Sequence, residues 1–127
     1  MKKFNFPLER MLNYQEQDLE KERGIMSRLL AARTGLEEKR LRLMEEMEEI
    51  QSERGKEIRK GTTIFSLRSS SVLLVSGKKQ LEEIRNELNR IDEEIEKQRQ
   101  IVVSVSQEVK KLENLKEKQL EEYRHAE

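Results

Sequence analysis

The chain has 127 residues, of which 34% are hydrophobic, 4% aromatic and 41% charged, and its 26 basic residues balance 26 acidic ones. The low apolar content argues against an ordinary compact globule, and the zero net charge argues against a nucleic-acid binder, which usually carries a basic excess. The absence of cysteine excludes a disulfide, a thiolate zinc site and a thiol nucleophile. Glu, Lys, Leu, Arg and Gln are abundant and favour helix formation, so the composition indicates long helices.

The first segment, FNFPLERMLNYQEQ at residues 4–17, holds two of the three phenylalanines and the only proline. Asn5 is a suitable helix cap, and Pro7 suits a first helical turn because its missing N–H is not needed there. These residues predict a helix from about residue 5 to about residue 60. Phe4 and Phe6 have two interpretations: they staple the helix start, or they are displayed as anchors for a partner.

Apolar residues recur along this first helix at steps of three and four, which is the heptad pattern of a coiled-coil seam. Arg33 and Arg40 interrupt the pattern, but long arginine stems can cover an apolar seam while the charge reaches water. Gln15 and Glu22 are harder to explain at such positions. The predicted seam comprises Leu12, Gln15, Leu19, Glu22, Met26, Leu29, Arg33, Leu36, Arg40, Leu43, Met47 and Ile50.

The helix signals fail at RKGTTIFS, residues 59–66. Gly61 suits the residue after a helix C-terminus, and Thr62 or Thr63 can cap the next helix. We therefore predict a turn at about residues 61–63. A turn at Ser69–Ser71 remains an alternative, because a register shift of one heptad would align the two seams equally well.

The second helix is predicted from about residue 64 to about residue 126, with a more regular seam. Its seam residues are Leu81, Ile84, Leu88, Ile91, Ile95, Gln98, Val102, Val105, Val109 and Leu112. The predicted fold is all-α: two long helices that form an antiparallel coiled-coil hairpin, in a single domain of residues 1–127. Residues whose numbers sum to about 124 then face each other across the seam.

The segment IFSLRSSSVLLVS, residues 64–76, has more apolar residues than the seam can use. Phe65, Val72, Leu73 and Val75 cannot all face inward on one helix. Exposed apolar surface often marks an interaction site, and the alternative is a local collapse around the turn. The run VLLV within this segment is far too short to span a bilayer, which needs about 20 residues, so we expect no membrane insertion.

Catalytic chemistry is poorly supported. The only histidine, His125, stands near the C-terminus of the sequence. Acidic runs such as EEMEE at residues 45–49 lack the spacing of a calcium loop, and such runs usually form a solvated helix face. The sequence therefore predicts no enzyme, no cofactor and no metal ion. A generic structural coiled-coil scaffold is one alternative for its function.

Two motifs resemble the FliJ family, small components of the flagellar type III export apparatus. KKFNFPLERMLNYQEQ is similar to the family's aromatic-rich start, with Phe6, Leu8, Leu12, Tyr14 and Glu16 in corresponding places. VKKLENLKEKQLEEYRHAE is similar to a block near the family's C-terminus. Its matching residues are Leu112, Glu113, Leu115, Lys116, Glu117, Lys118, Glu122 and Tyr123.

The resemblance implies a coiled-coil hairpin similar to the stalk of rotary ATPases, located in the cytoplasm at the flagellar base, on the inner face of the membrane, with a role in motility and chemotaxis. It also implies three partners: the hexameric export ATPase, the membrane export gate and export chaperones. A stalk protein of an injectisome, the related virulence system, remains an alternative. Candidate ATPase contacts are Phe4, Phe6, Leu112, Leu115, Lys118 and Tyr123, and the candidate gate or chaperone contacts are Phe65, Val72, Leu73 and Val75.

Overall fold

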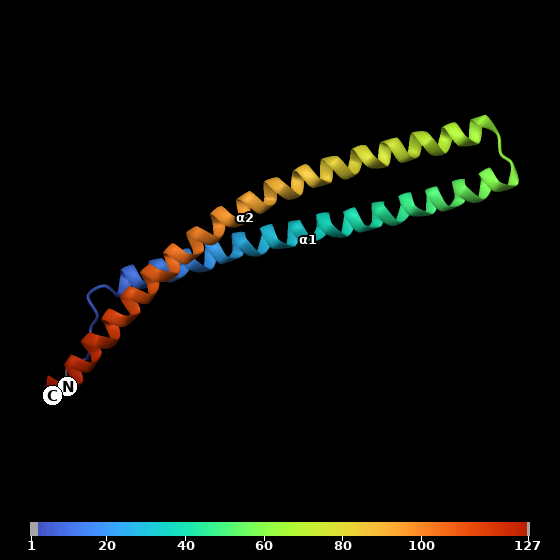
Figure 1. Ribbon diagram of the computed structural model, residues 1–127. Coiled ribbons are helices and arrows are strands. Elements are labelled where there is room, and N and C mark those ends of the chain that lie inside the picture. Colours follow the sequence, from blue (N-terminus) through green and yellow to red (C-terminus); the bar gives the residue numbers. More distant parts are fainter. Residues whose placement is uncertain (1–2, 127) are drawn as a thin grey trace. The chain divides into compact units, whose positions relative to one another are not determined.

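The computed structural model describes residues 3–126 and shows two long helices (Figure 1). Helix α1 spans Glu9–Lys60 and helix α2 spans Ile64–Ala126. In the described residues these two helices are the only regular elements. They run antiparallel and pack on each other, which confirms the predicted all-α hairpin.

Helix α1 begins at Glu9, later than the predicted start near residue 5. The Glu9 N–H donates to the Phe6 carbonyl at 3.1 Å and closes a turn in which Pro7 holds the second position. Proline favours that position because its fixed φ fits the turn. The first helical bond follows, from the Leu12 N–H to the Leu8 carbonyl at 2.9 Å. Asn5 and Pro7 therefore precede the helix and do not form its first turn.

Gly61, Thr62 and Thr63 separate the two helices. Gly61 has a φ of +89°, the left-handed region that glycine adopts without a steric penalty. Thr63 caps α2, because its hydroxyl accepts from the Ser66 N–H at 3.1 Å. The Ser66 hydroxyl donates to the Glu57 carboxylate at 3.0 Å and ties α2 to the last turns of α1. The alternative turn position, Ser69–Ser71, lies inside α2.

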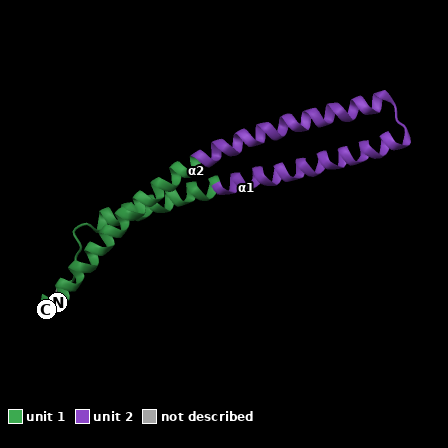
Figure 2. Cartoon of the chain, in the orientation of Figure 1, with its two compact units in different colours: residues 1–29, 94–127 green, residues 30–93 purple. Residues whose placement is uncertain are grey.

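The chain divides into two compact units (Figure 2). Unit 1 comprises residues 1–29 and 94–127, and unit 2 comprises residues 30–93. Each unit is a segment of α1 packed on a segment of α2. The prediction of a single domain stays a prediction.

The burial pattern follows the predicted seam. All ten predicted seam residues of α2 are buried or half-buried, and of the twelve in α1 only Arg40 is exposed. In unit 2 a Cβ added at Gly77 would stand 2.7 Å from the Met47 Sδ, so glycine permits a close approach of the two helices there. These two residue numbers sum to 124, the register that the turn near Gly61 requires.

Two polar pairs link the helices at seam positions, whereas Arg40 pairs with Glu37 on its own helix. In unit 1 Gln98 is only 7% exposed. Its side-chain amide donates to the Glu22 backbone carbonyl at 3.0 Å and also to the Glu22 carboxylate. In unit 2 the Arg33 Nε lies 2.6 Å from an Asp92 carboxylate oxygen. The hydrogen bond to Asp92 and its negative charge raise the pKa of Arg33 above its ordinary value. Polar partners at seam positions disfavour other registers, in which they would lose each other.

A pair of Gly→Ala substitutions tests the turn. Gly61→Ala should lower the free energy of unfolding by about 1 kcal/mol, because alanine is strained at a positive φ. The matched control is Gly24→Ala in the interior of α1, where an added Cβ meets no atom within 4 Å. That control should raise the free energy of unfolding by up to about 1 kcal/mol through helix propensity. Urea unfolding followed by circular dichroism measures both, and stabilisation by Gly61→Ala would contradict the turn geometry.

Candidate functional site

The terminal end of unit 1 has its own apolar core, which we call the terminal cluster. Its buried members are Phe6, Leu12, Leu19 and Val109, with Phe4, Leu8, Val102, Val105, Leu112 and Leu115 packed against them. Phe6 is only 4% exposed. The segment before α1 therefore folds back onto the helix pair, and burial favours the stapling interpretation of Phe6 over display as a free anchor.

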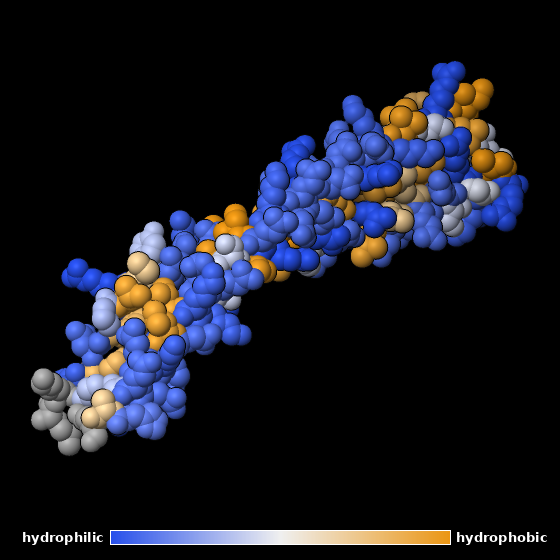
Figure 3. Space-filling model, turned by 60° about the vertical axis from the view of Figure 1, so that its left-hand side comes forward, coloured by the Kyte–Doolittle hydropathy of each residue, from blue (hydrophilic) through white to orange (hydrophobic). Residues whose placement is uncertain are grey.

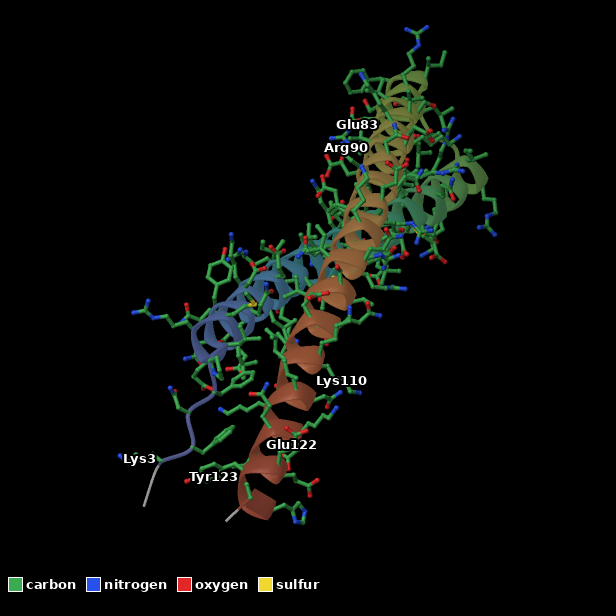
Figure 4. The ribbon with its side chains drawn as sticks, turned by 90° about the vertical axis from the view of Figure 1, so that its left-hand side faces the viewer. Lys3, Glu83, Arg90, Lys110, Glu122 and Tyr123 are labelled. Carbon is green, nitrogen blue, oxygen red and sulfur yellow. The ribbon has the colours of Figure 1, made fainter. Side chains whose placement is uncertain are left out.

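Aromatic and charged contacts brace the terminal cluster. The rings of Phe4 and Tyr123 have centroids 5.6 Å apart at a tilt of 50°, a favourable geometry for an aromatic pair. Figure 4 shows Tyr123 near the end of α2, beside the N-terminal segment. The Lys116 ammonium lies 2.8 Å from the Glu9 carboxylate and joins α2 to the first turn of α1. The start of α1 and the end of α2 are thus held together within unit 1.

The six predicted ATPase contacts differ in their exposure. Phe4, Phe6, Leu112 and Leu115 meet in the terminal cluster, and Tyr123 joins them through Phe4. Lys118 is exposed and stands outside the cluster. The sequence did not single out Met11 and Tyr14 as candidate contacts. They are 51% and 68% exposed, and they stand one helical turn apart on α1.

The four predicted gate or chaperone contacts are all exposed. Phe65 is 80% exposed, Val72 and Val75 are each 67% exposed, and Leu73 is 56% exposed. Ile58 and Ile64, at 55% and 70%, extend the apolar surface across the turn. The predicted alternative of a local collapse is therefore not what the structure shows. We call these six residues, Ile58, Ile64, Phe65, Val72, Leu73 and Val75, the tip patch.

Apolar surface is visible at the turn end of unit 2 (Figure 3). Six exposed large apolar side chains within residues 58–75 differ from the scattered single ones that most protein surfaces carry. The burial of Leu67 and Leu74 on the same helix shows that the seam is already satisfied there. The tip patch is therefore additional to what the fold requires.

Recesses in the two units offer little for chemistry. Unit 1 has a surface groove of about 730 Å³ where Gly24 and Ser106 leave space between the helices. Unit 2 has one of about 640 Å³ beside Arg33 and Asp92. Among residues 3–126 no group of three or more His, Cys, Asp or Glu side chains is placed to hold a metal ion. Within the same range, neither helix has a stretch long and apolar enough to cross a bilayer.

The fold defines an antiparallel coiled-coil protein. The comparison with protein families matches residues 4–127 to the family described as flagellar FliJ protein. The chain therefore belongs to the FliJ family and is a component of the flagellar export apparatus, a family that is not known for enzymatic activity. Comparisons with curated proteins and with solved structures gave no match.

Two phenylalanines of contrasting burial test the terminal cluster. Phe6→Ala should lower the free energy of unfolding by about 3 kcal/mol, because it removes a buried aromatic ring. Phe65→Ala, the matched control at 80% exposure, should change it by less than about 0.5 kcal/mol. Urea unfolding followed by circular dichroism compares the two, and equal effects would show that Phe6 does not belong to a packed core.

Proposed function

We propose that this protein is a non-enzymatic stalk of the flagellar export apparatus that binds the hexameric export ATPase through unit 1. The observation that carries the proposal is the match of nearly the whole chain to the FliJ family, together with the antiparallel hairpin. In this proposal the export ATPase hydrolyses ATP, and the present chain binds the ATPase without catalysing a reaction itself. The protein acts in the cytoplasm at the base of the flagellum, next to the membrane that holds the export gate.

The ATPase contact uses the exposed side chains around the terminal cluster. Met11, Tyr14 and Lys118 offer two apolar groups and a cation to a partner, and the cluster beneath holds the helix ends together. Phe6 supports this surface from inside, so its effect on binding would be indirect. A stalk that contacts one conformation of an ATPase subunit better than another shifts the ring toward that conformation. Stimulation of hydrolysis follows from such a bias.

The tip patch is the candidate surface for a second contact, with the export gate or an export chaperone. Its support is the exposure of Phe65, Val72, Leu73 and Val75 together with the family assignment. The generic scaffold is disfavoured, because α1 and α2 of a single chain already cover the seam that a second chain would need. The family description names the flagellar system, which favours it over an injectisome.

Steady-state ATP hydrolysis by the cognate export ATPase, with and without this protein, tests the proposal. We expect stimulation by the wild-type chain and a loss of at least about half of it in the variant Met11→Ala/Tyr14→Ala, because both side chains are exposed at the proposed contact. The matched control is Val72→Ala/Val75→Ala, two exposed apolar side chains of the tip patch. It should stimulate as well as the wild type.

Two results would count against the ATPase contact. One is an absence of stimulation by wild-type protein that is shown to be folded and monomeric. The other is an equal loss in the Met11→Ala/Tyr14→Ala variant and the control, since the surface would then have no specificity for unit 1. Thermal unfolding of each variant shows that the fold is intact, and we expect little change because all four side chains are exposed.

A further inference from the structure

The charge around the tip patch is unlike that of the whole chain. From Ile58 to Leu81 the sequence has no Asp or Glu, although the complete chain carries equal numbers of acidic and basic residues. The same span has five basic residues, all exposed: Arg59, Lys60, Arg68, Lys78 and Lys79. The opposite segment of α1 carries glutamates, among them Glu57, which accepts a hydrogen bond from Ser66, so the cationic excess belongs to the α2 side of the tip patch.

The basic and apolar side chains share one face of α2. Phe65, Arg68, Val72, Val75 and Lys79 follow one another at steps of three and four, so they form one stripe along the helix. All five are exposed, whereas Leu67, Leu74 and Leu81 form the seam on the other side of the helix. A stripe of apolar residues flanked by lysine and arginine is typical of a helix that lies in a lipid–water interface.

The stripe ends where acidic residues return. Glu82 and Glu83 follow Leu81, and beyond them α2 carries both signs of charge on its exposed faces. Figure 4 shows Glu83 and Arg90 extending from the same side of the helix. Along α2 the cationic, apolar character is therefore confined to residues 64–81.

We propose that the tip patch binds the surface of an anionic lipid bilayer. Phe65, Val72 and Val75 enter the interfacial layer, and the stems of Arg68 and Lys79 extend along it so that their charges reach lipid phosphates. Charge complementarity supports lipid as the occupant of the α2 face, because every ionised side chain of α2 from Ile64 to Leu81 is positive. The contact is with the lipid surface and requires no membrane-spanning helix.

The shape of the patch also favours lipid over an acidic helix of another protein. Three of its apolar side chains stand at the hairpin end: Ile58 near the end of α1, and Ile64 and Phe65 in the first turn of α2. The grooves described above are lined by other residues. A helix docks best in an apolar groove, whereas a bilayer accepts a convex surface.

Vesicle flotation with the full chain tests the inference. We expect binding to vesicles of phosphatidylcholine and phosphatidylglycerol at roughly a 3:1 ratio, and at least about tenfold weaker binding to phosphatidylcholine alone. Added salt should weaken the binding to anionic vesicles. The variant Phe65→Ser/Val72→Ser should lose at least about tenfold in binding, and Arg68→Gln/Lys79→Gln should lose binding to anionic vesicles in particular.

The matched control is Ile101→Ser/Val103→Ser, which removes two exposed apolar side chains of unit 1 and should bind as the wild type does. Because the chain has no tryptophan, a Phe65→Trp variant provides a direct probe. Its emission should shift to the blue when anionic vesicles are added. Circular dichroism confirms that each variant is folded.

Three outcomes would overturn the inference. The first is no flotation and no emission shift with either vesicle type. The second is equal loss in the Ile101→Ser/Val103→Ser control. The third is self-association of the chain through the tip patch with no vesicle binding, which would assign the patch to a second copy of the chain. The assay contains no export protein, so its failure leaves the proposed ATPase contact untouched, and the reverse also holds.

Discussion

The interhelical seam is the constraint on which the rest of this structure depends. In a chain with 34% hydrophobic residues, α1 and α2 bury one apolar stripe each against the other. The seam holds some polar residues as cross-helix pairs, as with Gln98 and Glu22, and leaves Arg40 exposed and paired within α1. The Met47 side chain of α1 approaches the α2 backbone closely at Gly77, where α2 has no side chain. Both features favour a single register.

Because the seam accounts for the fold, apolar side chains outside it require another explanation. In unit 1 the additional phenylalanines close the terminal cluster, where Phe6 is buried and Phe4 pairs with Tyr123. In unit 2 Phe65 and its neighbours remain exposed in a region without acidic residues. The same residue type therefore serves stability in one unit and is available for contact in the other.

Periodicity predicted the helices and the seam well, because a heptad pattern follows directly from helix geometry. It did not choose between the two registers, which differ by one heptad. The Gly61 signal also located the turn, since a positive φ restricts the residue type so strongly. Periodicity could not show that α1 starts after Pro7, or that Phe6 folds back into the core. Those facts depend on a non-helical segment and on contacts with Val109, far away in the sequence. Exposure of Met11 and Tyr14 likewise depends on which face α2 leaves uncovered.

Disulfide trapping tests the central claim, a hairpin within one chain in this register. The chain has no native cysteine, so Met47→Cys/Gly77→Cys should form one intrachain bond on mild oxidation, because the two positions lie in contact. The matched pair Met47→Cys/Ile91→Cys, which would face each other if the turn lay at Ser69–Ser71, should stay reduced. A non-reducing gel with mass analysis distinguishes the products. Crosslinking of the second pair, or interchain dimers from the first, would contradict the account.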